Sequence, residues 1–423
     1  MFVHIDIDSF FVSAERARDH SLCAVPVAVG GRSDLKIFKK GYAVTKVMNL
    51  NGGAFVAPVF HSTKEKRSFE RHFVERNEKG TKIRGIVTTA SYEARAKGVE
   101  TGMPLARALR LCPEMKVLPA DLLYYHRLSH ELYLFLSSCI PKTEQYSIDE
   151  FFGDLDGWVD MDEAVAFAKR LQQEILERFF LPVSIGIAKS KWTAKLATGY
   201  AKPYGILMIE DIEDFIQDIP VAAFPGVGRG YAKRLKALGI ERLGEVASQK
   251  RLFSRWGKSG ERLYKRILGI DAERIEPGKS RQSIGMSRTF DPLRNKEEIR
   301  RRVMIMARHI SWIALEMGVN PTLYLLRLRC SGGERLKAGR RVERVFSEFL
   351  FKKTLSDILE EILVGSCGVV KISLSVSDFV SIRPRTLSML SLEKDMLFAR
   401  LGEAVHSARA RFGLDMIKTG SEI

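Results

Sequence analysis

The stretch HIDIDSFF, residues 4–11, decides how the first part of the chain folds. Asp6 and Asp8 alternate in it with isoleucines, and two phenylalanines follow. Strict alternation of this kind predicts a short strand whose side chains point to opposite faces. Carboxylates in so apolar a strand require an explanation, because a buried charge is costly unless it is paired.

The composition indicates a multidomain protein with an anionic partner. At 423 residues and 45% hydrophobic content, the chain predicts about two to four domains with sizeable cores. The net charge of +17 favours nucleic acid as partner, with an acidic membrane surface as the second candidate. No apolar run approaches the roughly 20 residues of a membrane span. The start lacks the lysines of a signal peptide, so we expect no membrane segment and a cytoplasmic location.

The five cysteines are scattered and form no CxxC pair. This spacing suits a reducing compartment and argues against a zinc ribbon or a disulfide scaffold.

The positive charge is concentrated in two windows. Residues 32–84 hold 13 Lys/Arg against 5 Asp/Glu, and residues 277–350 hold 16 against 7. Either window alone is equally well explained as a solvated face. Two separated basic windows around a neutral remainder favour two surfaces that face one polyanion.

A second acidic centre lies in EQYSIDEFFGDL, residues 144–155, which reads as a pair of strands around Asp149 and Glu150. Together with Asp6 these carboxylates form a set of hard oxygen ligands that suits Mg²⁺. Two such ions, about 3.5–4 Å apart, are the usual arrangement for phosphoryl transfer. Each acidic pair taken alone is more often a turn or a helix cap.

Further residues fit the same chemistry. Thr89, Tyr92 and Arg95 follow one another at spacings of three in TASYEAR, which predicts one face at the start of a helix. Arg95 is suited to clamp a phosphate with two hydrogen bonds, and Lys195 to add a point charge. Each of these residues taken singly is ordinarily a surface residue.

A third motif, FPGVGRGYAKRLKALGI, spans residues 224–240. Gly226 and Gly228 allow backbone N–H groups to approach a phosphate at a helix start, and Lys233 and Arg234 follow on that helix. The pattern predicts a helix-hairpin-helix that grips the DNA backbone. The alternative is a simple connection between two helices.

These motifs, together with VPVAVGG, MPLARALRLCP, SIGIAKSKWTAKLATGYAKP and QSIGMSRTF, resemble the Y-family of translesion DNA polymerases, within it the bacterial DNA polymerase IV branch. They stand in the family's order and cover most of the first 290 residues. The resemblance implies a multidomain α+β fold shaped like a right hand. It implies a ferredoxin-like palm, enlarged fingers, a small helical thumb with the helix-hairpin-helix, and a βαββαβ little finger.

The implied boundaries are a palm at residues 1–9 and 121–209, fingers at 10–120 with a basic insertion at about 32–85, a thumb at 210–276, a linker at 277–282, a little finger at 283–381 and a tail at 382–423. The family crosses the interval of the insertion in far fewer residues. Two interpretations of the insertion stay open, an added finger subdomain that contacts DNA and a solvated loop.

The resemblance also implies roles for single residues. The metal ligands are Asp6, Asp149, Glu150 and the carbonyl of Ile7, for two Mg²⁺ ions. The nucleotide contacts are Phe10, Phe11, Thr89, Tyr92, Arg95 and Lys195, with Phe11 as the steric gate below the sugar. Asp8 falls outside the ligand set and is expected to be structural.

The implied function is DNA-templated, error-prone DNA synthesis without proofreading, by a monomer acting on primer–template DNA and deoxynucleoside triphosphates. Two other classes remain open. An accessory DNA-binding relative is disfavoured by the intact carboxylates, and a nucleotide cyclase by the thumb motif and the basic second half.

The segment TLSMLSL, residues 386–392, resembles the short clamp-binding peptide of bacterial polymerases in a degenerate form. Leu387, Met389 and Leu390 have the spacing to enter an apolar pocket on the sliding clamp. The alternative is an apolar anchor that packs the tail onto its own domain.

Overall fold

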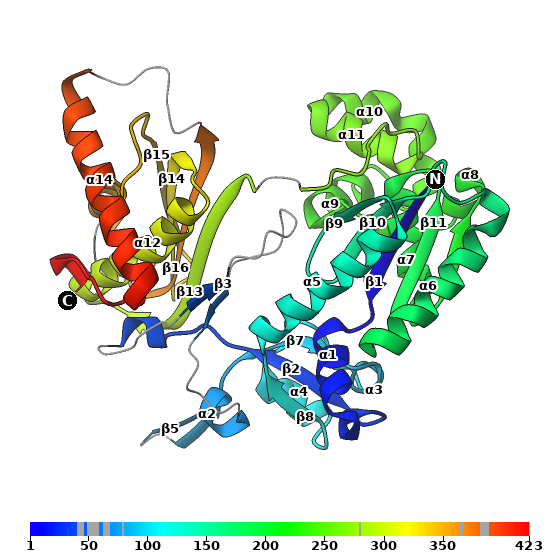
Figure 1. Ribbon diagram of the computed structural model, residues 1–423, viewed down its shortest axis with the longest axis horizontal. Coiled ribbons are helices and arrows are strands. Elements are labelled where there is room, and N and C mark those ends of the chain that lie inside the picture. Colours follow the sequence, from blue (N-terminus) through cyan, green and yellow to red (C-terminus); the bar gives the residue numbers. More distant parts are fainter. Residues whose placement is uncertain are drawn as a thin grey trace. The chain divides into compact units, whose positions relative to one another are not determined.

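A computed structural model describes residues 1–39, 46–48, 59–61, 68–77, 80–278, 281–363, 365, 367–380 and 389–422. Its contacts divide the chain into two compact units (Figure 1). The first comprises Met1–Gly31, Leu50–Val56 and Ser68–Lys279, and the second comprises Arg32–Asn49, Ala57–Arg67 and Ser280–Ile423.

The first unit is built on a five-stranded sheet with the order β12-β11-β1-β10-β9. Its strands are β1 (Phe2–Ile7), β9 (Lys142–Gln145), β10 (Glu150–Asp154), β11 (Val183–Ala188) and β12 (Ile206–Ile209). The first strand runs antiparallel to both of its neighbours, β10 and β11. The strand expected from the opening motif is therefore the centre of the sheet, and all six of its residues are buried.

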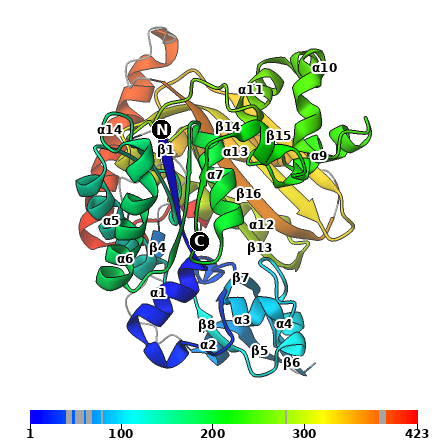
Figure 2. The same ribbon diagram turned by 90° about the vertical axis from the view of Figure 1, so that its right-hand side faces the viewer.

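The two faces of β1 have different neighbours, as its alternation requires. Val3, Ile5 and Ile7 belong to a core formed with helices α5 (Leu122–Cys139) and α6 (Ala164–Phe179). Phe2 belongs to a smaller core with helix α7 (Lys191–Ala201), and His4 bonds Thr198 of that helix. Figure 2 shows these helices around the sheet. Asp6 follows on the face that is covered by α7.

A smaller sheet, ordered β7-β2-β8, completes the sheets that carry the site. Its strands are β2 (Val27–Gly31), β7 (Ile86–Ala90) and β8 (Lys116–Pro119). The other elements of this part are α1 (Phe10–Arg18), α2 (Phe69–Phe73), α3 (Tyr92–Ala96), α4 (Leu105–Leu111) and the hairpin of β5 (Val74–Asn77) and β6 (Gly80–Ile83). Helix α1 starts directly after the opening strand, so the two phenylalanines of the motif form its first turn.

A helical part with its own apolar core ends the first unit. It contains α8 (Ile212–Ile216), α9 (Arg229–Lys236), α10 (Lys250–Arg255) and α11 (Gly257–Ile267). Short 3₁₀ helices over the whole chain are η1 (His20–Leu22), η2 (Lys36–Phe38), η3 (Met161–Glu163), η4 (Val221–Ala223), η5 (Leu243–Gln249) and η6 (Gly420–Glu422).

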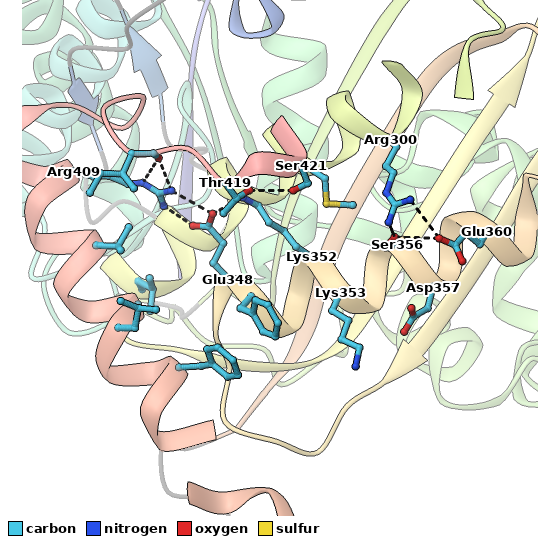
Figure 3. Close-up of a pocket in the computed structure, with 18 residues that line it drawn as sticks. Arg300, Glu348, Lys352, Lys353, Ser356, Asp357, Glu360, Arg409, Thr419 and Ser421 are labelled. Carbon is cyan, nitrogen blue, oxygen red and sulfur yellow. Dashed lines mark hydrogen bonds and ion pairs between the residues drawn. The ribbon is translucent and has the colours of Figure 1, made fainter. Parts of the chain in front are cut away.

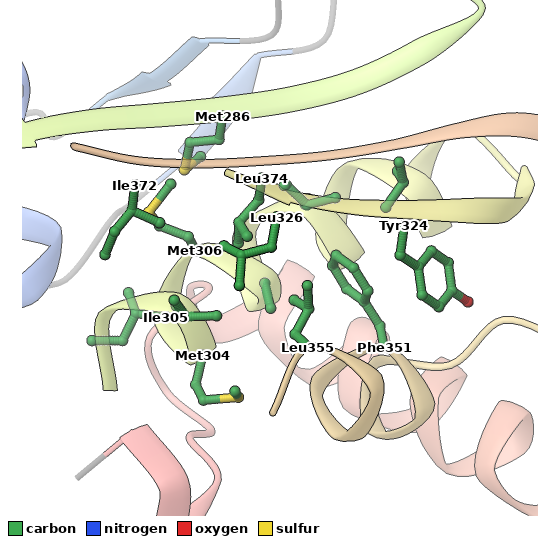
Figure 4. Packing of buried hydrophobic residues seen from close by; sticks show 14 of the residues in the cluster. Met286, Met304, Ile305, Met306, Tyr324, Leu326, Phe351, Leu355, Ile372 and Leu374 are labelled. Carbon is green, nitrogen blue, oxygen red and sulfur yellow. The ribbon is translucent and has the colours of Figure 1, made fainter. Parts of the chain in front are cut away.

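The second unit has the expected order of strand, helix, strand, strand, helix, strand. Its elements are β13 (Ser283–Leu293), α12 (Lys296–Glu316), β14 (Asn320–Cys330), β15 (Arg335–Arg341), α13 (Glu348–Ile362) and β16 (Val369–Val380), and the sheet order is β13-β16-β14-β15. Side chains of the sheet such as Leu326 and Leu374 point toward those of the two helices, such as Met306 and Leu355 (Figure 4).

Buried ion pairs hold the end of the chain onto this unit. Helix α14 (Met389–Phe412) and the residues after it lie against α12 and α13. Glu348 lies between Arg409 and Lys352 beside a cavity of about 550 Å³ (Figure 3). Arg308, with a side chain only 1% exposed, pairs with Asp415 and Glu422.

Three observations differ from or qualify the sequence-based expectations. The described residues of the basic insertion, for which a finger subdomain and a solvated loop were both open, contain η2, β3 (Lys46–Met48), β4 (Val59–His61), α2, β5 and β6. Cys330 and Cys367 form a disulfide, which their separation of 37 residues did not predict. Within the part of the chain that the structure describes, no helix is both long and apolar enough to cross a membrane.

Candidate active site

The two acidic centres of the sequence meet on neighbouring strands. Asp6, near the end of β1, is the cross-strand partner of Glu150, the first residue of β10. The N–H of Ile7 donates to the carbonyl of Asp149 over 2.9 Å. Antiparallel pairing therefore places all three carboxylates at adjoining positions, although 142 residues separate Ile7 from Asp149. Such cross-strand neighbours have Cβ atoms about 4.5–5.5 Å apart.

Each carboxylate has its own partner in the structure. Lys202 Nζ lies 2.5 Å from Asp6 Oδ1, and Lys195 forms an ion pair with Glu150. Ser147 Oγ donates to Asp149 over 2.5 Å. Lys195 reaches Glu150 because α7 packs directly on β11, where a Cβ at Gly186 would lie only 2.1 Å from the Ala194 carbonyl oxygen. A glycine is required at this position of the sheet.

Burial and like charge raise the pKa of two of these carboxyl groups. Burial raises the pKa of Asp6 to about 7, the charges of Asp149 and Glu150 add to the rise, and Lys202 opposes it. Burial also raises the pKa of Asp149, again with a contribution from Glu150. Crowded carboxylates of this kind require cations to stay ionised.

The donor set fits a hard divalent cation in the chemical type of its ligand atoms. Three carboxylates and one backbone carbonyl provide only oxygen ligands. In the described part of the chain, however, no three His, Cys, Asp or Glu side chains stand close enough to hold one metal ion. Asp6 and Glu150 are instead paired with Lys202 and Lys195. Metal binding at these residues therefore requires the two ammonium groups to turn away.

Asp8 is buried and serves as a hydrogen-bond acceptor for three separate elements. Ser184 Oγ of β11 donates to it at 3.0 Å, the Tyr204 N–H at 2.7 Å and Tyr92 Oη of α3 at 3.2 Å. Burial and the charge of Asp8 raise the pKa of Tyr92, so the phenol keeps the proton that it donates. Asp8 therefore joins the end of β1 to β11, to α3 and to the turn after Lys202, in keeping with the structural role expected for it.

The ring of Phe11 is held by a stacked aromatic neighbour. Phe11 and Tyr125 have ring centroids 4.5 Å apart and planes inclined by 16°. Tyr125 is fully buried, and its hydroxyl donates to Glu15 of α1. Phe10 is buried in the core of the sheet, and its ring meets that of Tyr125 edge-on with the ring centroids 6.1 Å apart. Phe11 is only partly buried, so one side of its ring is fixed and the remainder is accessible.

The three residues of the TASYEAR motif come together at the end of a strand rather than on one helix. Thr89 belongs to β7, whereas Tyr92 and Arg95 belong to α3, so the expected single helical face is wrong for Thr89. Arg95 is exposed, and its Nε donates to the Ala90 carbonyl over 3.0 Å. Its guanidinium lies 5.2 Å from the centre of the Tyr92 ring.

The glycine motif and the tail segment lie apart from these residues in the sequence. Gly226 has a φ of 98°, which favours glycine, and Gly228 precedes α9 as its N-cap. Lys233 and Arg234 on α9 are exposed. In the tail, Leu387 lies outside the described residues, and Met389 and Leu390 begin α14.

Sequence reasoning missed two residues of the site. Lys202 was not singled out, although it directly precedes a proline at the end of the block that contains Lys195. Tyr125 was not singled out either. No local signal identifies either of them, because their partners Asp6 and Phe11 are more than 100 residues away in the sequence.

Comparison with known proteins gives consistent matches. Residues 5–199 match the impB/mucB/samB family. A protein of Yersinia enterocolitica named DNA polymerase IV is 31% identical over 293 residues, which cover 68% of this chain and 70% of that protein. A protein of the same name from Methanoculleus marisnigri is 31% identical over 293 residues, with 68% and 69% covered.

Solved structures match over nearly the whole chain. A Y-family DNA polymerase chimera of Dbh and Dpo4 gives a TM-score of 0.71 at 23% identity and covers 90% of this chain and 99% of its own. The insertion ternary complex of Dbh DNA polymerase gives 0.56 at 23% identity, with the same coverage. At these identities the likeness concerns the fold.

A substitution of Asp8 tests the buried hydrogen-bond set. We expect Asp8→Asn to lower the free energy of unfolding of the first unit by about 1–3 kcal/mol, because three donors lose a buried, charged acceptor. Urea unfolding followed by circular dichroism measures the change. The control is Asp156→Asn, whose side chain is 74% exposed and whose change should stay within about 0.5 kcal/mol. Equal unfolding of both variants would contradict the assigned role.

Proposed function

Since the chain belongs to the Y-family of translesion DNA polymerases, matched by its impB/mucB/samB segment and by relatives named DNA polymerase IV, we propose that its chemistry takes place at Asp6, Asp149 and Glu150. The chain is a DNA-directed DNA polymerase, which adds deoxynucleotides to a primer 3′-OH. The observation that carries the assignment is the cross-strand pairing of Asp6 with Glu150, with Asp149 bonded through its carbonyl to Ile7.

The reaction is an in-line displacement at the α-phosphorus of the incoming nucleotide. The primer 3′-oxygen forms the new P–O bond, and the bond to pyrophosphate breaks. Asp6, Asp149, Glu150 and the Ile7 carbonyl would hold two Mg²⁺ ions. When bound, these ions supply charge stabilisation for the attacking oxygen and for the leaving pyrophosphate. The carboxylates fit this task because they are already crowded and require cations.

The positive side chains nearby would bind the triphosphate. Lys195 and Lys202 are the counter-ions of the carboxylates, and they become available to phosphate oxygens when divalent cations replace them. Arg95 presents an exposed guanidinium that suits a phosphate, and Tyr92 is fixed beside it through Asp8. Thr89 and the backbone of Phe10 complete the proposed contacts.

Phe11 is proposed as the steric gate against ribonucleotides. A 2′-hydroxyl over its ring would clash or lose its hydrogen-bond partners, which costs about 1–3 kcal/mol. A gate works only if its ring cannot move aside. The stacking of Phe11 on the buried Tyr125 provides that rigidity.

DNA would be held mainly through phosphates, by the helix-hairpin-helix at Gly226 and Gly228 and by the basic second unit. The exposed Lys233 and Arg234 follow the proposed hairpin, and Arg327 and Arg329 are exposed on β14. Contacts of this kind depend little on sequence and weaken steeply with salt. We also propose a monomer that works in the cytoplasm.

The sliding clamp is a proposed partner through Leu387, Met389 and Leu390. Salt-sensitive phosphate contacts alone release DNA quickly, and tethering to a ring around the duplex raises the effective concentration of the enzyme at the primer end. Because Met389 and Leu390 start α14, binding as an extended peptide requires the first turn of this helix to open.

The metal assignment has a direct test. Asp149→Ala or Glu150→Gln should lower primer extension by at least about 100-fold, the scale of losing one group that stabilises transition-state charge. Primer–template affinity should change little, because the DNA is held elsewhere. Single-turnover extension and fluorescence anisotropy measure the two quantities. The exposed Glu163→Gln is the matched control, and extension above a few per cent in either variant would refute the assignment.

The sugar gate is tested in two steps. Phe11→Ala should lower the discrimination between dATP and ATP by about tenfold or more, in line with the cost of an unpaired hydroxyl. Tyr125→Leu should lower it less, because the phenylalanine stays but loses its stacking partner. Single-turnover incorporation of both nucleotides measures the ratio. Unchanged discrimination in Phe11→Ala would place the gate at another residue.

The clamp contact is tested by changing Leu387 and Leu390 together to alanine. The gain in product length with loaded clamp should vanish, while distributive extension without clamp keeps its rate. Leu397→Ala, which removes a side chain 64% exposed in the same helix, is the control. A parallel loss of both activities in the double variant would show that the segment packs the fold instead.

A further inference from the structure

The start of the basic insertion belongs to the second unit, although the chain on both sides of the insertion belongs to the first. Gly31 is the last residue of β2 and pairs with Ile86 in the first unit. Ser33, two residues later, already bonds β13 of the second unit. We name residues 33–39 the anchor segment.

The apolar part of the anchor segment is built into the core of the second unit. Ile37 and Phe38 are 4% and 5% exposed and belong to the same apolar cluster as Met286, Ile305 and Leu374, whose packing Figure 4 shows. The Phe38 ring meets Phe290 of β13 edge-on, with centroids 6.5 Å apart. These contacts are those of core residues and differ from those of a solvated loop.

A cationic side chain covers the aromatic pair. The Arg302 guanidinium of α12 lies 4.9 Å from the centre of the Phe38 ring and 4.6 Å from that of Phe290. Glu298, one turn earlier on α12, accepts from Arg302 Nε over 2.7 Å and fixes the guanidinium. Each such contact of a cation with an aromatic ring favours the packed state.

The backbone of the anchor segment is held as well. Arg301 donates to the Phe38 carbonyl over 2.8 Å, and Arg288 donates to the Asp34 carbonyl over 3.0 Å. The Thr289 N–H of β13 donates to Ser33 Oγ over 3.2 Å. Strand β13 is an edge of its sheet, so the anchor segment also satisfies and covers an edge that would otherwise offer unpaired groups.

The geometry points to an intramolecular docking site on the second unit, formed by β13 and α12, whose ligand is the anchor segment of the same chain. The linker near residue 280 is therefore not the only covalent tie between the units, because the chain also passes from the first to the second just before the anchor segment. Only Arg32 stands between β2 and Ser33, and a chain of two peptide units reaches about 7 Å at most. The insertion acts as a short strap at this point.

The strap restricts how far the second unit moves from the first. A domain with fewer accessible positions binds a shared DNA substrate with a smaller loss of freedom. This consequence rests on the proposed DNA contact of the second unit. The docking of the anchor segment does not depend on it.

Cleavage of the linker tests the docking directly in the full chain. A specific protease site is placed in residues 277–282, the protein is cut there, and the two fragments are separated by size exclusion at about micromolar concentration and high salt. We expect the cut protein to elute as one species, because the first fragment keeps its anchor segment in the core of the second. Ile37→Ala combined with Phe38→Ala should weaken the association by at least about tenfold, since two buried side chains are truncated.

The matched control is Phe349→Ala, which removes a phenylalanine of the same unit that is 52% exposed and should leave the association unchanged. Hydrogen exchange of β14 and β16 reports whether the double variant remains folded. Separation of the cut wild-type fragments would overturn the proposal. So would an equally tight association in the double variant, because another contact would then hold the fragments together.

A second variant leaves the docking site intact and lengthens the strap. A flexible Gly-Ser stretch inserted after Arg32 should keep the cut fragments together, yet weaken primer–template binding of the uncut protein by about threefold to tenfold through a lower effective concentration. The same stretch inserted after Gly157, in an exposed loop, is the control. Unchanged DNA affinity would refute the restraint, whereas loss of extension in the metal-site variants concerns the proposed catalytic residues alone.

Discussion

A carboxylate buried in an apolar strand must be met by a cation, and Asp6 imposes this requirement on the first unit. Its strand has one face in the main core, so Asp6 necessarily falls on the other face, beneath α7. That face also receives Glu150 from the neighbouring strand and two lysines from the block that contains α7. Burial raises the pKa of Asp6 and the charges of Asp149 and Glu150 add to the rise, and a divalent cation would offset both effects.

Rigidity around this acidic centre comes from buried polar and aromatic contacts. Asp8 stands two residues after Asp6 and binds a hydroxyl, a phenol and a backbone N–H from three elements. Tyr125 stacks on the ring of Phe11, and its hydroxyl donates a hydrogen bond to Glu15. Groups that we propose to touch a nucleotide are thus held in place by buried neighbours that we assign no nucleotide contact.

The chain passes from the first unit into the second within two residues at the start of the insertion. The basic composition of the insertion was compatible with a DNA contact or a solvated loop. Its first part is instead held in the second unit by two buried apolar side chains, by hydrogen bonds to the carbonyls of Asp34 and Phe38, and by one to Ser33 Oγ. Its later part, from α2 to β6, belongs to the first unit. The net charge of the segment indicated only the character of its exposed surface. The burial of Ile37 and Phe38 determines which core it packs into.

The sequence by itself determined the opening strand and the residues of the acidic centre, because alternation and motif spacing are local properties. The resemblance of its motifs to a known family also implied the element order of the second unit. Only the tertiary structure decided that Lys202 pairs with Asp6, that Tyr125 supports Phe11, that Cys330 meets Cys367 and that the anchor segment enters a distant core. These partners lie far apart in the chain, and no local pattern records which strands and helices are brought together when the apolar faces are buried.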